Sequence, residues 1–223
     1  MKASELLERS IDAEAWRKQS RALRRSAAAL WNSFSDSIIS EVRDSIAEGR
    51  ALNLDMAAGY LETCKLLFGL TLETALKALI IEHQPEKIEV RSNIDGSGNI
   101  VSAELRTIGL ATSQSHNLLT LAEVAGLFDG TIPDVFNSDF DKQAFRDICR
   151  NLGEAVSWRG RYPVPLTSFE PLTYNPKVPT LALGHYLLDF LDPVLDRLLG
   201  PCEVEVLPNI TGSIQLEEPT IPV

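Results

Sequence analysis

Apolar residues recur at helical spacing along the stretch from Tyr60 to His83, which contains no proline. Gly69 is the residue in this stretch that weakens a helix. The apolar side chains fall on nearly every side of such a helix, which is typical of a helix inside a bundle. We therefore expect a buried central helix whose apolar positions are Leu61, Cys64, Leu67, Phe68, Leu72, Ala75, Leu76, Leu79 and Ile80.

Two charged residues of this stretch, Glu73 and Lys77, lie four positions apart, with the acid on the N-terminal side. This order favours an ion pair on a helix. In a buried helix the pair also needs hydrogen-bond partners from elsewhere in the chain. The alternative is two solvated charges on an exposed edge of the helix.

Residues 4–50 carry apolar side chains in steps of three and four, which predicts one or two helices. Gly49 lies where this pattern ends, and Asn53 and Asp55 are candidate caps for the following helix. The inward-facing stripe consists of Leu23, Ala27, Leu30, Phe34, Ile38, Val42 and Ile46.

Three further helices are expected in the C-terminal half of the chain. The first starts at Ser115, a candidate N-cap. The second starts at Ser138, where an acid three residues later resembles a capping box, and continues to about Trp158. The third covers Thr180–Leu199, and the proline inside it predicts a kink or a new start capped by Asp192.

Residues 86–112 differ from the helical segments because apolar residues alternate on both sides of a glycine-containing turn. The pattern predicts an inserted β-hairpin with its turn at Asp95–Asn99. The turn lacks the lysine of a phosphate-binding loop. Residues 201–223 are expected to form a C-terminal extension with two strand candidates, Glu203–Leu207 and Ser213–Leu216. Across the hairpin, we expect Ile88, Val90 and Ile94 to face Ile100, Val101 and Leu105.

Length and composition fit a single domain over residues 1–223, of which 44% are hydrophobic and 23% charged. The fold class indicated is all-α, a bundle of about five main helices with the small inserted β-hairpin. No apolar run reaches the roughly 20 residues that a membrane span requires, and no secretion signal is visible. Three widely spaced cysteines are typical of reduced thiols. We expect a cytoplasmic protein without membrane contact.

The sequence lacks the motifs of several common kinds of site. His83, His116 and His185 lie far apart and no Cys-x-x-Cys pair is present, so no metal site is expected. Neither a Gly-x-Ser-x-Gly elbow nor a Gly-x-Gly-x-x-Gly motif after a strand occurs, and we expect no cofactor. The net charge of −10 argues against a protein that coats nucleic acid through its overall field. It is compatible with a local basic patch.

The most basic stretch of the chain is the cluster Arg17, Lys18, Arg21, Arg24 and Arg25. Three of its arginines share one helix face and are placed to meet phosphate groups. The alternative is that they pair with nearby acids within the chain or solvate the helix.

Polar and aromatic residues recur in three expected core segments, Leu-Glu-Thr-Ala-Leu-Lys-Ala-Leu, Ser-His-Asn-Leu and Trp-Arg-Gly-Arg-Tyr-Pro. The order of these segments along the helices resembles the HEPN superfamily, all-α domains found in prokaryotic toxins and defence proteins and beside nucleotidyltransferases. The resemblance covers residues 55–200. The supporting polar core in these segments consists of Glu73, Lys77, His116, Asn117 and Trp158.

The resemblance also implies where catalysis would lie. Catalytic members of the superfamily are metal-independent ribonucleases with an Arg, a polar residue and, four to six residues after the Arg, a His. Arg150 and Asn151 match the first two positions in the expected helix. Ala155, Val156 and Ser157 stand where the histidine belongs, so no general base for a ribose 2′-hydroxyl is evident there.

The resemblance and the missing histidine together indicate a non-catalytic, dimeric protein that binds RNA, a nucleotide or a partner protein. Arginine suits phosphate groups, and aromatic rings can stack on a base. Two alternatives stay open: a ribonuclease that uses a residue such as His116, and an interaction module whose basic groups all pair within the chain. The expected ligand contacts are Arg146, Arg150, Asn151, Arg159, Arg161 and Tyr162.

The same residues have a structural interpretation. Trp158 and Tyr162 also suit the core of a bundle, and Arg161 is then expected to bond to a helix end or to Glu73. His116, at the start of a helix, is in that case a cap or a buried ring.

Overall fold

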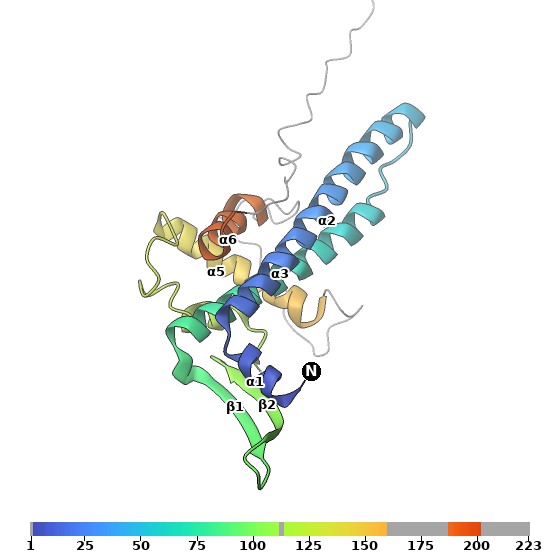
Figure 1. Ribbon diagram of the computed structural model, residues 1–223. Helices are drawn as coiled ribbons and strands as arrows, with labels where there is room; N and C mark the ends of the chain where they lie inside the picture. The colour runs from blue at the N-terminus through green and yellow to red at the C-terminus, as the bar shows by residue number, and fades with distance from the viewer. Residues whose placement is uncertain (1, 112–113, 160–186, 202–223) are drawn as a thin grey trace, which may run out of the picture.

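The computed structural model describes residues 2–111, 114–159 and 187–201 (Figure 1). Within these residues the chain forms six α-helices and a two-stranded antiparallel hairpin inserted after the third helix. The predicted fold class, a helical bundle with a small inserted β-hairpin, is confirmed. The elements are α1 (Ala3–Ser10), α2 (Ala13–Glu48), α3 (Asp55–His83), β1 (Ile88–Ile94), β2 (Ile100–Ile108), α4 (Leu118–Val124), α5 (Asp139–Glu154) and α6 (Asp192–Leu199).

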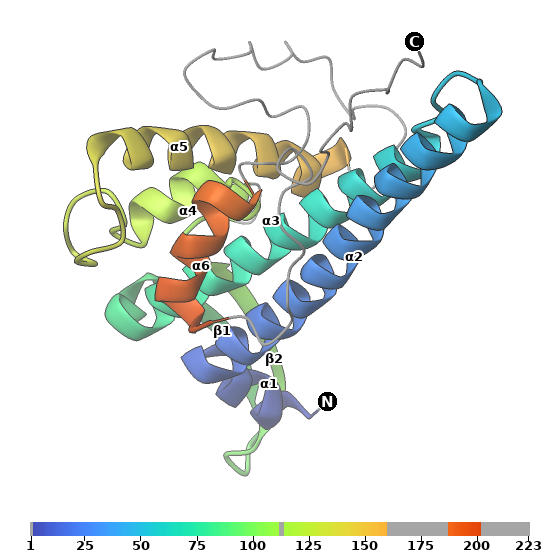
Figure 2. The ribbon, with the colours of Figure 1, turned by 90° about the horizontal axis from the view of Figure 1, so that it is seen from above.

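α2 and α3 run antiparallel and form a long arm that extends beyond the rest of the molecule (Figures 1 and 2). α2 ends where Gly49 adopts a left-handed conformation with φ 62°, as predicted for this position. Between the helices, the Glu41 carboxylate accepts hydrogen bonds from the Arg50 guanidinium and, at 2.6 Å, from the backbone N–H of Asn53. Asn53 in turn accepts from the N–H of Asp55. These bonds hold the connection in one conformation.

The core surrounds α3, which is helical throughout the expected stretch and begins earlier, at Asp55. α2 lies along one side of α3, and α4, α5 and α6 lie on the other (Figure 2). Leu72, Leu76 and Ile80 of α3 have no exposed surface. Full burial of such side chains stabilises a fold by about 1.5–3 kcal/mol each, so α3 is the centre of the bundle, as the apolar pattern predicts.

Gly69 marks a close approach between α3 and the end of α5. A Cβ atom at this position would lie 2.5 Å from Cγ2 of Val156 and 3.2 Å from the carbonyl oxygen of Leu152. The residue that weakens α3 as a helix therefore allows the two segments to pack together.

α5 begins as predicted. Ser138 Oγ accepts a hydrogen bond from the N–H of Asp141 at 3.1 Å, and the Asp141 carboxylate accepts from the N–H of Asn137 at 3.2 Å. After α5 the chain continues in a wider, π-helical turn over Ala155–Arg159, so the expected end near Trp158 is confirmed. π-Helical turns occur frequently at functional sites.

Two predicted caps in the C-terminal half are wrong, and at the start of α3 the cap position is occupied by Leu54 rather than by Asn53 or Asp55. Asn117, not Ser115, caps α4, and its side chain accepts a hydrogen bond from a backbone N–H of the first turn at 3.2 Å. Asp192 lies inside the first turn of α6, which follows a π-helical turn over Leu187–Leu191. The Asp192 carboxylate binds Arg24 instead of capping the helix.

β1 and β2 form a sheet of two strands that projects from the bundle, with α1 packed against β2 (Figure 1). Val90 pairs with Leu105 and Ile94 with Ile100, as expected. Val101 is the extra residue of a β-bulge, so the expectation that it faces β1 is wrong.

Part of the predicted secondary structure lies outside the described residues. This holds for the strand candidates Glu203–Leu207 and Ser213–Leu216 and for the expected start of the last helix at Thr180. In the described ranges, no helix is long and apolar enough to cross a membrane.

Candidate functional site

Glu73, Lys77 and His116 form one network, and the Glu73 side chain at its centre is 7% exposed. Oε1 of Glu73 accepts a hydrogen bond from Nζ of Lys77 at 2.5 Å, and Oε2 lies 2.9 Å from Nδ1 of His116. The predicted pair on α3 is therefore present. The additional partner that a buried carboxylate needs comes from the segment before α4.

Exposure rises along this network from α3 toward His116. The side chain of Lys77 is 12% exposed and that of His116 is 44% exposed. The Lys77 ammonium also lies 5.8 Å from the centre of the Trp16 ring on α2, within the range of a cation–π interaction. The network thus starts in the core and ends at an imidazole that solvent reaches.

The contact with Glu73 fixes the chemistry of the imidazole. In the neutral ring, Nδ1 carries the proton that it donates to the carboxylate, and Nε2 is the acceptor. In the protonated ring, Nε2 is a donor. A carboxylate that orients a histidine in this way is a recurring arrangement in base catalysis. The exposed ring can therefore either accept a proton or bind an anion.

The end of α5 lies beside His116. A Cβ atom at Gly153 would lie 4.0 Å from both the carbonyl oxygen of His116 and the backbone nitrogen of Leu118. Arg150 precedes Gly153 by one helical turn, so its backbone lies on the order of 10 Å from that of His116. The C-terminal end of α5 and the segment that carries His116 are therefore neighbours.

The arginines of α5 make contacts within the chain. Arg150, with 41% of its side chain exposed, donates from Nη1 to Oδ1 of Asp147 at 2.5 Å. The guanidinium carbon of Arg146 lies 4.2 Å from the centre of the Phe128 ring, which is a stacking contact. Asn151 is half-buried on the same helix and also has an intramolecular partner. All three side chains retain exposed surface, and each also has a contact within the chain.

The remaining expected site residues are placed less completely. Trp158 and Arg159 belong to the π-helical turn after α5, where the structure describes the backbone of both but not their side chains. Arg161 and Tyr162 lie outside the described residues, as does an Arg161–Glu73 pair. Asn117 is exposed as the cap of α4 and is not part of the buried polar group.

Three arginines of the basic cluster of α2 are engaged in ion pairs. Arg17 pairs with Glu82 on α3, and Arg21 pairs with Glu14. These contacts favour pairing within the chain over phosphate binding for this cluster, as in the alternative that makes the chain an interaction module.

Arg24 of the same cluster is enclosed by α6. Its side chain is 2% exposed, and Nη2 lies 2.7 Å from a carboxylate oxygen of Asp192 and 2.7 Å from one of Asp196. Nη1 donates to the carbonyl oxygen of Gly200 at 2.8 Å. The guanidinium therefore joins α2 to α6 and faces no ligand.

The buried thiols are not candidates for nucleophiles. Burial raises the pKa of the Cys64 thiol to about 12 and also raises the pKa of the Cys149 thiol. Both thiols are protonated and inert at neutral pH. Across the described part of the chain, no three His, Cys, Asp or Glu residues gather closely enough to hold a metal ion.

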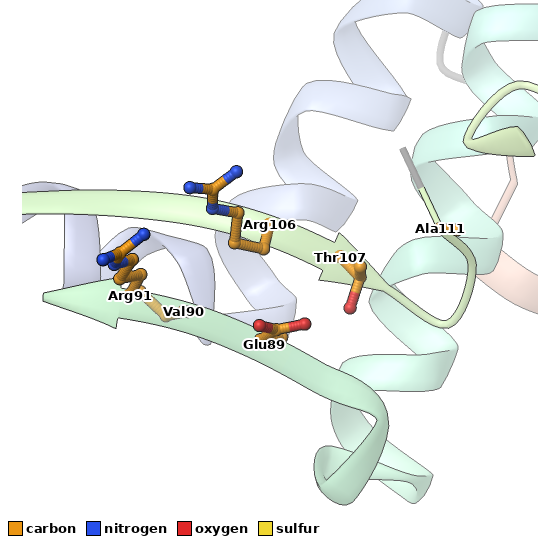
Figure 3. Close-up of a pocket in the computed structure, with 6 residues that line it drawn as sticks. All are labelled: Glu89, Val90, Arg91, Arg106, Thr107 and Ala111. Atoms are coloured by element: carbon orange, nitrogen blue, oxygen red, sulfur yellow. The ribbon is translucent and has the colours of Figure 1, made fainter. Parts of the chain in front are cut away.

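A surface hollow of about 620 Å³ lies along the β-hairpin (Figure 3). Arg91 and Arg106 project beside it from neighbouring strands, and Glu89 and Thr107 also line it. Arg106 forms an ion pair with Glu104 at 3.0 Å. Arg106 is thus matched by an acid on the hairpin, and Glu89 adds a negative charge to the lining, so the hollow gives little reason to expect a phosphate ligand.

Trp16 is a member of the network that sequence analysis missed. It stands in a charged stretch at the start of α2, and its contact with Lys77 depends on how α2 and α3 are aligned along the arm. The apolar pattern of one helix does not specify how it is aligned with the other, so no signal in the sequence predicts the contact between Trp16 and Lys77.

Comparison with known proteins gives no match: no family model, no curated protein and no solved structure is significantly similar to this chain.

Proposed function

We propose that this chain is a HEPN-like protein that binds RNA or a nucleotide as a dimer, without cleaving it. The observation that carries the proposal is the exposed His116 ring held by the buried Glu73 carboxylate. Because Lys77 balances the charge of Glu73, protonation of His116 gives the network a net positive charge, which favours a phosphate ligand.

Two further features support this proposal. Arg150, on the neighbouring turn of α5, offers a guanidinium whose other donors can reach a phosphate. Ala155–Ser157 contain no histidine, which supports binding without the ribonuclease motif of the superfamily. The order of the helical segments, which resembles that superfamily, supports RNA or a nucleotide as the ligand.

The proposal is tested by binding of labelled single-stranded RNA and labelled nucleotides at two salt concentrations. We expect affinity to fall as salt rises, to fall about tenfold in His116→Ala and to fall several-fold in Arg150→Ala. Arg43→Ala removes the same charge from the distant arm and is expected to leave affinity unchanged. Binding that is insensitive to salt, or insensitive to both site substitutions, contradicts the proposal.

A second candidate function is RNA cleavage with His116 as the general base. The observation that favours it is the 2.9 Å contact with Glu73, which leaves Nε2 as the acceptor in the neutral ring. Nε2 would take the proton of a ribose 2′-hydroxyl and the 2′-oxygen would attack phosphorus. The bond from phosphorus to the 5′-oxygen would break as this oxygen takes a proton from water, and the imidazolium would return its proton to solvent. The product is a 2′,3′-cyclic phosphate.

This candidate is separated from the first by incubating RNA with the protein in excess chelator. Cleavage that disappears in His116→Ala and in Glu73→Gln supports the ribonuclease. RNA that is bound but stays intact supports the non-catalytic protein.

A further inference from the structure

We infer that β1 is a docking edge for β1 of a second copy of the chain, so that two hairpins join into one four-stranded antiparallel sheet. This interface rests on the proposed function because it specifies how the proposed dimer forms. It involves none of the residues of the ligand site.

The two strands of the hairpin differ in how they are protected. α1 packs against β2, and β2 contains the extra residues of both β-bulges, Val101 and Arg106. Bulges and covering elements are features that block unwanted pairing at a sheet edge. β1 has no extra residue and, within the described ranges, pairs only with β2. Since a sheet of two strands is marginally stable by itself, β1 gains stability from another strand.

The hydrogen bonds of the hairpin show which backbone groups β1 directs outward. At one end, the carbonyl oxygen of Lys87 accepts from the N–H of Gly109 at 3.0 Å. At the other end, the N–H of Asp95 donates to the carbonyl oxygen of Asn99 at 2.9 Å. The bonding direction alternates along a strand, so odd-numbered residues of β1 face β2. The residues that direct N–H and C=O toward the open edge are Ile88, Val90, Ser92 and Ile94.

A two-fold axis at Val90 fits these groups. Val90 then forms a hydrogen-bonded pair with the partner's Val90, and Ile88 pairs with the partner's Ser92 on either side. Glu89 comes opposite the partner's Arg91, and Arg91 opposite the partner's Glu89. Both charge pairs occupy non-hydrogen-bonded positions, where facing side chains approach most closely. Glu89 and Arg91 are exposed in the isolated chain (Figure 3).

Neighbouring registers fit less well. An axis at Ser92 places Glu89 opposite the partner's Asp95, which brings like charges together. An axis at Arg91 keeps the edge-facing backbone groups paired, because Val90 then bonds to the partner's Ser92, but it places two arginines opposite each other. Hydrogen bonding allows each of these axes, and charge selects the axis at Val90.

The inference is tested by sedimentation velocity of the full chain over a range of micromolar concentrations. We expect a reversible monomer–dimer equilibrium that Val90→Pro abolishes. The N–H lost in that variant points away from β2, so the hairpin itself tolerates the proline. Glu89→Arg and Arg91→Glu are each expected to weaken the dimer about tenfold or more, because each brings like charges together twice.

Mixing the two charge variants tests directly whether Glu89 and Arg91 pair across the interface. Each chain of the mixture offers the charge that the other lacks, so an equimolar mixture of Glu89→Arg and Arg91→Glu is expected to regain the wild-type dimer. Hydrogen exchange gives an independent measurement. The amides of Val90 and Ser92 are expected to become protected as concentration rises, whereas the Arg91 amide, which faces β2, does not change.

A wild-type chain that stays monomeric, or a dimer that the charge variants and their mixture leave unchanged, overturns the inference. Circular dichroism shows whether Val90→Pro folds, and if it does not, the mixture decides. RNA binding by monomeric variants separates this inference from the ligand site. A dimer that binds no RNA contradicts the proposed ligand alone, and RNA binding by a chain that never dimerises contradicts the dimer and its interface but not the ligand.

Discussion

Two ionic networks of the bundle differ in the group that each buries and the group that each exposes to solvent. Arg24 joins α2 to α6, and its donors are satisfied by Asp192, Asp196 and the carbonyl of Gly200. Glu73 joins α3 to the segment before α4, but its network ends at the exposed ring of His116. The Arg24 guanidinium is enclosed, and the exposed end of its network is the Asp196 carboxylate, 47% exposed, which repels a phosphate group. The exposed end of the Glu73 network is an imidazole, which can bind one. The kind of group at the exposed end, rather than the buried charge, distinguishes a candidate site from a structural joint.

The enclosed network also shows what its burial requires. Burial by itself lowers the pKa of the Arg24 guanidinium, but the charges and hydrogen bonds of Asp192 and Asp196 outweigh this effect and raise the pKa. Burial raises the pKa of Asp192, although Arg24 opposes this shift. Each partner therefore compensates the buried charge of the other, and loss of one leaves the other poorly compensated.

The largest effect is expected from Arg24→Met. The substitution leaves Asp192 without its cation and removes the bond to Gly200, so we expect the free energy of unfolding to fall by about 3–5 kcal/mol, as measured by urea denaturation. Arg21→Ala is the matched control, because Arg21 makes an ion pair with Glu14 on the surface, and it should cost at most about 1 kcal/mol. Equal effects of the two substitutions would remove the distinction between enclosed and surface pairs.

Gly69→Ala is expected to have the next largest effect. A methyl group there would overlap Val156, so α5 must move away from α3, at a cost of about 1–3 kcal/mol in unfolding free energy. Because α5 also lies beside His116, RNA affinity should fall together with stability.

Two controls test this explanation for Gly69. Gly59→Ala lies on the same helix with no atom within 4 Å of the added Cβ, and is expected to be neutral or stabilising. Gly69→Ala combined with Val156→Ala should recover part of the lost stability. No recovery in the double variant would show that the overlap is not the cause.

Two substitutions in the Glu73 network test the comparison further. We expect Glu73→Gln to affect stability more and His116→Ala to affect RNA binding more. Glu73→Gln removes the carboxylate that Lys77 and His116 share, and we expect it to cost about 1–2 kcal/mol of stability. His116→Ala should cost less than about 1 kcal/mol, since its ring is exposed. In RNA binding, His116→Ala should be the more damaging of the two. The same order in both measurements would indicate that His116 has a purely structural role.

The sequence predicts those features that depend on neighbours along one element. The apolar period predicts α3, the spacing of Glu73 and Lys77 predicts their ion pair, and Gly49 predicts the end of α2. Contacts between different elements are harder to predict from the sequence. Arg24 finds its acids 168 and 172 residues away, and the link from Glu73 to His116 crosses 43 residues. Such links depend on how helices align in three dimensions, which no local period encodes.

The β-bulges escaped sequence analysis for a related reason. An alternating pattern predicts which residues can face each other, but one extra residue changes the partner of every residue beyond it. The pattern therefore predicts the wrong position for Val101, although it predicts both strands.

The smallest effect is expected at the tip of the arm, where Glu41 and Arg50 form an exposed counterpart of the Arg24 network. The hydrogen bonds from Arg50 and from the Asn53 N–H lower the pKa of Glu41 from 4.5 to about 2. In this window the unfolded chain binds more protons than the folded chain, so the contribution of Glu41 is complete above about pH 4.5 and is lost as the pH falls toward 2. Glu41→Gln should therefore flatten the fall in unfolding free energy over this window, as measured by urea denaturation at several pH values. Asp44→Asn, on the same helix and outside the Arg50 contact, should leave the slope nearly unchanged. If the two variants flatten the slope equally, the Arg50 contact is not the source of the pH dependence. The contact between Glu41 and Arg50 then contributes little to the free energy of unfolding, in contrast to the Arg24 network.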